Sequence, residues 1–499
     1  MNSLIPGDPA DEALLGQVCP PGWVNPTPRG RYHLVVVGAG TGGLVTAAAA
    51  AGLGARVALV ERHLMGGDCL NVGCVPSKAL ISAARAWHGA ASAGERFGGP
   101  AVAGSGDFGR AMARMRSLRA GLSPVDGAAR FRDLGVDVFL GEGRFVAPNA
   151  VAVGGARLEF RRGVVATGAR AAVPAISGLA ESGYLTNETV FTLTECPKHL
   201  VVIGAGPVGC ELAQTFRRFG AAVTLLTRDD RILPKDDGAA ALLVQRRLEA
   251  EGIVIVTKAR IERVDRKGNH SVVVVTGVGS FEADRILVAA GRAPNVDGLG
   301  LDQAGVRFDA RGVSVDDRLR TSNPAIFAVG DVCTPFQFTH VADFHARLVV
   351  QNALFFGRGK ASALVIPWCT YTSPEVAQVG LTVDQAKAAG RPVDVVEVGF
   401  EHVDRAVLDG QETGLLKVIL AQGTDRILGA TLVADHAGEM IGEIAVAMTN
   451  GLGLGAIGRT IHPYPTQSEV FRKAADQWRR RKLTPLVKVL FRKWFSVFR

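Results

Sequence analysis

Two glycine-rich stretches constrain the fold of this 499-residue chain more than any other feature. In "HLVVVGAGTGG", Gly38, Gly40 and Gly43 follow an apolar run typical of a buried strand and precede an alanine-rich helix; the next strand ends at Glu61 and Arg62. The glycines of such a strand–turn–helix unit let the backbone approach a pyrophosphate at the helix N-terminus, and an acid at Glu61 accepts from a ribose hydroxyl. The stretch therefore predicts a dinucleotide site.

The same pattern recurs in the middle of the chain. "HLVVIGAGPVG" supplies Gly204, Gly206 and Gly209, and the following strand ends in Thr227 and Arg228 without an acid. An arginine in place of the acid suits the 2′-phosphate of NADPH, whereas the alternative is that Arg228 only faces water. The second site therefore favours NADPH over NADH.

The order of the segments predicts how the domains are organised. A chain of this length suggests roughly three domains. After the second unit, the run "AIFAVGDVC" ends a buried strand at Asp331, whose carboxylate can bind a polyhydroxyl chain such as the ribityl of FAD. We interpret the second unit as an insertion in the first, with residues 31–160 and 285–360 forming an FAD-binding domain and residues 161–284 an NAD(P)H-binding domain.

The two ends of the chain have different compositions. Residues 361–476 alternate strand-like runs with helix, which predicts an antiparallel sheet with covering helices. Residues 1–30 are polar and Pro-rich, lack a secretory signal, and predict a flexible leader; with seven mostly scattered cysteines they favour a cytoplasmic protein. The predicted fold class is α/β, with two nested Rossmann-like domains and a C-terminal α+β domain.

Two cysteines lie close together in "GGDCLNVGCVPSK". A zinc site needs about four ligands, and no second cysteine or histidine pair is evident; inert buried thiols do not need flanking glycines. In a reducing compartment the spacing of Cys69 and Cys74 favours a redox pair over either alternative.

These motifs, with "ATGA", "GRAPN" and "AVGD" in the same order, resemble the FAD-dependent pyridine nucleotide-disulfide oxidoreductases of class I, which include dihydrolipoamide dehydrogenase, glutathione reductase and mercuric reductase. The resemblance covers about residues 32 to 476. It implies that Cys69 and Cys74 form a redox-active disulfide reduced through FAD, with Cys74 beside the flavin and Cys69 facing the substrate. It also implies that Lys78 lies near the flavin and pairs with Glu211.

Other positions carry over from matching motifs. The resemblance implies contacts with FAD or the nicotinamide at Gly67, Lys78, Gly143, Thr167, Gly168, Gly291, Asp331, Gln337 and His340. A metal cluster of His340, Asp343 and His345 is the less favoured alternative, because a helix that begins there points at the flavin in the family.

The sequence departs from its disulfide-reducing relatives in "IHPYPTQSE". Those relatives place a histidine base five residues before a glutamate, and here Tyr464 stands in that position ahead of Glu469. A phenol, with a pKa of about 10, is a poor base at neutral pH, so either His462 replaces it or His462 is a bystander. Mercuric reductases also carry a tyrosine near this position, although their N-terminal metal-binding domain and C-terminal cysteine pair are not matched: the last cysteine here is Cys369.

The C-terminal segment, residues 477–499, carries most of the net charge of +9: eight basic residues and no acidic one lie between Arg479 and Arg499. One helical stripe would hold Leu483, Leu486, Val487, Leu490, Phe491, Trp494, Phe495 and Phe498, with Lys488, Arg492 and Lys493 on the other side. The pattern predicts a basic amphipathic helix that contacts a membrane surface or packs on the protein itself. We expect no nucleic-acid partner, since no known module for it is recognised.

We therefore expect a homodimer in which each active site borrows the C-terminal element of the partner chain, as the resemblance implies. The expected activity is electron transfer from NAD(P)H through FAD and the cysteine pair to a metal ion such as Hg(II) or to a thiol-reactive acceptor. The alternatives are a small-disulfide or quinone reductase, and a membrane-associated redox-responsive flavoprotein.

Overall fold

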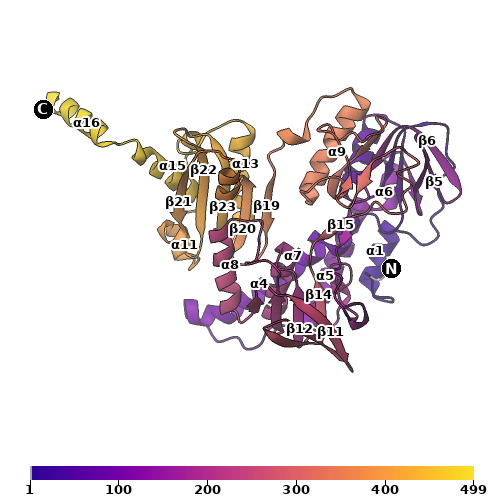
Figure 1. Cartoon of the computed structure of the whole chain (residues 1–499), viewed down its shortest axis with the longest axis horizontal. Helices are drawn as coiled ribbons and strands as arrows, with labels where there is room; N and C mark the ends of the chain where they lie inside the picture. The colour runs from indigo at the N-terminus through magenta and orange to yellow at the C-terminus, as the bar shows by residue number, and fades with distance from the viewer. Residues whose placement is uncertain (1–2, 499) are drawn as a thin grey trace.

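A computed structural model describes residues 3–498, which fold into three parts and a projecting C-terminal helix (Figure 1). The first part is built on a seven-stranded sheet of order β3-β2-β1-β6-β5-β4, with β18 beside β6. Its strands are β1 (Tyr32–Val37), β2 (Val57–Glu61), β3 (Val136–Leu140), β4 (Arg144–Ala147), β5 (Ala150–Val153), β6 (Ala156–Val165) and β18 (Ile326–Ala328). β3, β2, β1, β6 and β18 run parallel and are covered on both faces, so β1 and β2 are apolar throughout most of their length.

Helices cover this sheet and connect it to the rest of the chain. They are α2 (Thr41–Gly52), α3 (Gly67–Val72), α4 (Cys74–Phe97), α5 (Phe108–Leu122), α6 (Ala128–Asp133) and α9 (Thr339–Leu354). The turn from β1 into α2 requires glycine at position 38, where φ is +104° and a Cβ would lie 2.4 Å from the Ala166 carbonyl oxygen.

The second part is a parallel four-stranded sheet of order β10-β9-β8-β14. It comprises β8 (His199–Ile203), β9 (Ala222–Leu226), β10 (Val254–Val256) and β14 (Arg285–Val288), with α7 (Pro207–Arg218) and α8 (Gly238–Ala250). Smaller antiparallel pieces are β11 (Ile261–Lys267), β12 (His270–Val275) and β13 (Gly279–Ala283), the pair β7 (Ala169–Ala171) and β15 (Arg292–Pro294), and the pair β16 (Phe308–Asp309) and β17 (Gly312–Val313). This sheet lies in sequence between β6 and β18 of the first, so the nested arrangement is confirmed.

The pairing of strands moves both expected boundaries of the inserted part. β6 stays in the first sheet as far as residue 165, and β14 pairs with β8, which places residues 285–288 in the second sheet. The boundaries expected at 160/161 and 284/285 are therefore a few residues too early. A short apolar strand carries no local mark of the sheet that it joins, because pairing partners decide that.

The third part is the expected α+β domain, an antiparallel sheet of order β19-β20-β23-β22-β21. Its elements are β19 (Pro367–Thr370), β20 (Glu375–Gly380), β21 (Val393–Gly399), β22 (Leu415–Ala421), β23 (Ile427–Ala434), α10 (Val383–Ala388), α11 (Asp404–Leu408), α12 (Ala437–Met440), α13 (Gly442–Thr449), α14 (Leu454–Ile457) and α15 (Glu469–Arg481). α15 runs past the boundary expected at residue 476.

The N-terminal segment is not the flexible leader that its composition predicts. Residues Pro9–Val18 form α1, capped by Asp8, and Leu14 and Val18 are fully buried in the core of the first part. Asp11 makes a buried ion pair with Arg119 of α5. The expectation is wrong for this helix because only these two apolar side chains and one buried acid signal its packing, between prolines that suggest a loop.

The C-terminal segment forms α16 (Pro485–Val497), the expected basic amphipathic helix, and Figure 1 shows it projecting beyond α15. Nothing in it is buried, so the expectation that it packs on the protein's own surface is wrong for the single chain. Within residues 3–498, no helix has both the length and the apolar character needed to cross a membrane.

Candidate active site

The two cysteines lie where two helices meet. Cys69 is in α3, and Cys74 is the first residue of α4. Gly67 has φ +56°, and a Cβ on it would lie 2.6 Å from the Cα of Gly40. Only a glycine therefore allows the cysteine segment to touch the first dinucleotide turn, and this contact fixes the thiols beside a nucleotide site.

The surroundings of the Cys74 thiol favour its ionised form. Its pKa is lowered to about 6, first by the hydrogen bond from Cys69, then by Thr339 and by the charge of Lys78, against the opposing effect of burial. The pKa of Cys69 is raised, mainly because it donates to Cys74 and also because it is buried. The Sγ of Cys74 lies 3.3 Å from Oγ1 of Thr339, the first residue of α9. The surroundings of the pair thus favour the thiolate on Cys74 and the proton on Cys69.

Lys78 and Glu211 form the ion pair that the resemblance implies. Lys78 Nζ lies 2.9 Å from Oε2 of Glu211, which is buried on α7, while Oε1 accepts from the backbone N–H of Tyr371 at 2.9 Å. The ammonium also lies 4.6 Å from the centre of the Tyr371 ring. The pair fixes a positive charge one turn of α4 beyond Cys74 and so stabilises a thiolate. No pattern in the sequence points to Tyr371, because its contact with Glu211 is made through the backbone.

Asp331 lies in a charged cluster that sequence reasoning missed. Arg292 of β15 contacts Asp331 at 3.3 Å and also pairs with Asp68, the residue before Cys69. Burial raises the pKa of Asp331, although the Arg292 charge opposes this shift. Arg292 is part of the "GRAPN" stretch but is far in sequence from both acids, so only the folded chain brings them together.

Both glycine-rich turns have the form that a pyrophosphate requires. Gly40 and Gly206 occupy the N-cap positions before α2 and α7, neither helix has a side-chain cap, and neither has an acid in its first turn. Their first N–H groups are therefore free of side-chain acceptors at the positive ends of the helix dipoles. Glu61 accepts from the N–H groups of Ala39 at 2.6 Å and His63 at 2.8 Å, which places its carboxylate at the first turn. These residues fit an FAD at the first turn and a nicotinamide nucleotide at the second.

The remaining expected cofactor residues have the following surroundings. Thr167 donates to the carbonyl of Asn295 at 2.7 Å, and Gly168 and Gly291 have φ of +65° and +122°. A Cβ at Gly143 would lie 2.8 Å from Val60. Four further expected cofactor residues are partly or fully exposed to solvent: Arg62, Arg228, Gln337 and His340.

His340 and His345 have separate surroundings. His340 lies with Nε2 2.7 Å from the Pro367 carbonyl oxygen and stacks on Phe338. His345 is buried, which lowers its pKa to about 4. In the part of the chain that the structure describes, no three histidine, cysteine or acidic side chains are grouped closely enough to hold a metal ion.

The C-terminal residues expected to handle protons are arranged differently from the expectation. Tyr464 is 69% exposed, and its hydroxyl donates to Asp404 at 3.1 Å, which raises the pKa of the phenol. Glu469 is buried and pairs with Arg472 instead of facing Tyr464. The sequence spacing between Tyr464 and Glu469 thus matches that of the base and glutamate in the disulfide-reducing relatives. In the structure, however, the acid that contacts Tyr464 is Asp404.

His462 is enclosed by two acceptors. Its Nε2 lies 3.0 Å from Oε1 of Glu443 and its Nδ1 3.1 Å from the Thr460 carbonyl oxygen. Both ring nitrogens are therefore directed at acceptors of the same chain. Within residues 3–498 no hydrogen bond or ion pair connects His462, Tyr464 or Glu469 to the cysteine pair of the same chain.

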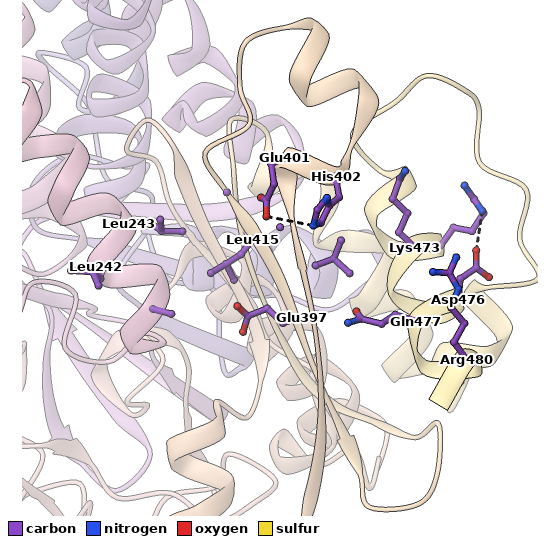
Figure 2. A pocket seen from close by; sticks show the side chains of 15 residues that line it. Leu242, Leu243, Glu397, Glu401, His402, Leu415, Lys473, Asp476, Gln477 and Arg480 are labelled. Carbon is purple, nitrogen blue, oxygen red and sulfur yellow. Dashed lines mark hydrogen bonds and ion pairs between the residues drawn. The ribbon is translucent and has the colours of Figure 1, made fainter. Parts of the chain in front are cut away.

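A cavity of about 820 Å³ lies apart from these residues, between α8, β21 and α15. Figure 2 shows its polar and charged lining, which includes Glu397, His402, Lys473, Asp476 and Arg480. None of the residues expected to bind a nucleotide or carry electrons lines it, so it is separate from the redox site.

Two nested dinucleotide-binding sheets, with an ionised thiol of a cysteine pair against the first turn, define a nucleotide-dependent dithiol oxidoreductase. The chain belongs to the pyridine nucleotide-disulphide oxidoreductase family: the family's model matches residues 32–346, and the model of its dimerisation domain matches residues 366–475. The family is FAD-dependent and uses NAD(P)H, and the second match supports a homodimer.

Individual relatives carry different activities in their names. A mercuric reductase of Lysinibacillus sphaericus is 36% identical over 89% of this chain and 82% of its own length. A dihydrolipoyl dehydrogenase of Thermus scotoductus is also 36% identical, over 89% of this chain and 97% of its own. Among solved structures, the Cu(II) complex of the HOCl-induced flavoprotein disulfide reductase RclA of Escherichia coli superposes with a TM-score of 0.80 at 28% identity, covering 90% of this chain and 100% of that one.

Proposed function

We propose that this protein uses NADPH to reduce a metal ion such as Hg(II), or another thiol-reactive acceptor, through FAD and the Cys69–Cys74 pair. The observation that carries the proposal is the Cys74 thiol, which begins a helix, accepts from Cys69 and lies near the Lys78–Glu211 ion pair. A thiolate stable at neutral pH is the leaving group and the soft ligand that this chemistry needs.

The residues around the cysteine pair have separate roles in this electron transfer. FAD held at the first glycine-rich turn would relay the electron pair of the nicotinamide to the Cys69–Cys74 disulfide. Lys78, fixed by Glu211, stabilises the thiolate that forms on Cys74, while Cys69 carries the shared proton. When both sulfurs bind Hg(II), the Cys69 proton leaves to solvent, the sulfur–sulfur bond re-forms, and two electrons pass to the metal, which departs as Hg(0).

The arrangement around Tyr464 favours a metal ion over a small disulfide. Reducing a disulfide needs a base that takes up and returns a thiol proton, whereas releasing a thiol-bound metal ion does not. Tyr464 has a raised pKa, and His462 has both ring nitrogens against acceptors. Mercuric reductase relatives and the RclA complex with Cu(II) agree with a soft or thiol-reactive metal. The dihydrolipoyl dehydrogenase relatives support the alternative, a small-disulfide reductase.

The choice of NADPH rests on the end of β9. Arg228 is exposed there and free to turn toward a 2′-phosphate. Asp229 and Asp230 follow it, and an Asp229 carboxylate oxygen lies 3.4 Å from the Thr227 hydroxyl, so the acids moderate this preference. The charge at the end of β9 still differs from the charge at the first glycine-rich turn. There the Glu61 carboxylate accepts hydrogen bonds from two backbone N–H groups.

One anaerobic experiment tests the proposal. The FAD-loaded protein is reduced with one equivalent of NADPH and then challenged separately with Hg(II), Cu(II), lipoamide, glutathione disulfide and a soluble quinone. We expect rapid reoxidation by Hg(II) or Cu(II) that is lost in Cys69→Ser and Cys74→Ser, and slow reoxidation by either disulfide. Reoxidation fastest with lipoamide or with the quinone would overturn the metal assignment, and negligible turnover with every acceptor would favour a redox-responsive flavoprotein.

A further inference from the structure

The C-terminal helix α16 presents an apolar face that no other part of residues 3–498 buries. Thr484 caps the helix through the N–H of Val487, and Pro485 occupies its first turn, so its start is well defined. The helix projects beyond α15 (Figure 1). It has no buried residue. At 100° per residue, half of its circumference is apolar and comprises Leu486, Val487, Leu490, Phe491, Trp494, Phe495, Val497 and Phe498, the apolar face of α16.

Aromatic side chains dominate this face. Trp494 is 60% exposed, Phe495 65% and Phe498 68%, and the rings of Trp494 and Phe498 lie 4.8 Å apart on successive turns. So large a contiguous apolar surface on a globular protein marks an interaction site. Tryptophan and phenylalanine are the side chains that lie favourably at the boundary between lipid headgroups and acyl chains.

The opposite side of the helix is positively charged. Lys488, Arg492 and Lys493 lie there, and the basic run from Arg479 to Lys482 lies at the end of α15, two residues before the start of α16 at Pro485. No acidic residue lies in this part of the chain. The cores of protein interfaces are depleted in lysine, whereas cationic side chains beside an apolar face match an anionic headgroup layer, at about 1 kcal/mol for each charge near the surface.

The length of α16 decides its orientation. Its 13 residues span about 20 Å at 1.5 Å per residue, less than the ~30 Å of a bilayer core. The helix is therefore too short to span and suited to lie in the plane of the surface, with the apolar face inward and the lysines and arginines at the headgroups.

We propose that α16 docks this enzyme on an anionic lipid surface. The inference is independent of the electron acceptor, because it concerns a helix outside the redox domains.

The test uses the full-length FAD-loaded protein and sedimentation with vesicles of phosphatidylcholine alone or with about 30 mol% phosphatidylglycerol. We expect at least about tenfold tighter binding to the anionic vesicles, weakened by added salt. Leu490→Asp with Trp494→Asp should lower this binding at least about tenfold and leave NADPH oxidation unchanged. Leu53→Asp, which changes another exposed leucine, is the matched control and should bind like the wild type.

A separate variant tests the contribution of the positive charges of α16. Lys488→Glu, Arg492→Glu and Lys493→Glu together should remove the preference for phosphatidylglycerol while keeping α16 helical. Failure of the wild-type protein to sediment with anionic vesicles, or equal loss in Leu53→Asp, overturns the proposal. A chain ending at residue 482 that becomes monomeric in sedimentation analysis assigns the face to a second copy of the chain and also overturns it.

Discussion

Lys78 acts on Cys74 through charge rather than contact. Its ammonium is fixed by the buried Glu211, and it favours the thiolate. Lys78→Met removes that charge and leaves the Glu211 carboxylate uncompensated, so the pKa of Cys74 must rise from about 6. Since a thiol is ionised only above its pKa, the thiolate fraction at pH 7 falls.

The measurement is a pH titration of the long-wavelength absorption that a thiolate gives beside the flavin in the two-electron-reduced protein. We expect the midpoint to move up by about one pH unit or more in Lys78→Met and to stay in place in Lys78→Arg, which keeps the charge. Cys74→Ser should lack the absorption, while Cys69→Ser should keep it. An unchanged midpoint in Lys78→Met would mean that Lys78 does not control the thiol.

Arg228 determines the nucleotide preference if it binds the 2′-phosphate. Arg228→Glu replaces attraction with repulsion, and a charge-assisted hydrogen bond contributes about 1.5–3 kcal/mol. We expect the KM for NADPH to rise about tenfold or more, the KM for NADH to change little, and Arg228→Lys to remain close to wild type. Equal use of NADPH and NADH by the wild-type protein would contradict this assignment.

The helix α1 ties the N-terminal segment to the cysteine segment. Arg119 is fully buried, pairs with Asp11 of α1 and donates at 2.7 Å to the carbonyl of Asn71, two residues beyond Cys69. Asp11→Ala leaves the guanidinium buried without its partner, which costs about 3–5 kcal/mol. We expect that loss in urea unfolding, together with faster loss of FAD.

The matched control is Asp133→Ala. Its ion pair with Arg132 is exposed on both sides, so its removal should change the free energy of unfolding by less than about 1 kcal/mol. Similar free energies of unfolding for Asp11→Ala and Asp133→Ala would show that α1 does not stabilise the segment that carries Cys69.

These elements also show what can be predicted from sequence. The two dinucleotide units were predictable because strand, glycine turn and helix are local and have strong periodicity. α1 was not, because its packing depends on Asp11 finding Arg119 more than a hundred residues away. The cluster of Arg292 with Asp68 and Asp331 was missed for the same reason, and so was the turn of Glu469 toward Arg472, since sequence spacing does not specify which way a side chain points.

At the scale of the whole molecule, the redox pair and Tyr464 lie in different domains. The match to a dimerisation domain supports a homodimer, and we expect position 464 of one chain to face the cysteine pair of its partner.

Tyr464→His should then raise lipoamide reduction, because Asp404, which now accepts from the phenol, can orient the new imidazole. A positioned base contributes about 10²–10⁴ in rate. Tyr464→Phe is the control, since it removes the hydroxyl without adding a base; high wild-type activity lost only in His462→Ala would assign the base to His462.

Hybrid dimers test whether the site is shared. A dimer is purified with one Cys74→Ser chain and one Tyr464→His chain, each carrying a different affinity tag. If the partner completes each site, the imidazole faces the site inactivated by Cys74→Ser and the intact cysteine pair still faces Tyr464, so the hybrid shows none of the gain. If each chain completes its own site, the intact cysteines and the imidazole lie together, and the hybrid keeps about half of the gain, because one site of two is active. Half-retention would therefore contradict a site shared between the two chains, whichever acceptor the protein reduces.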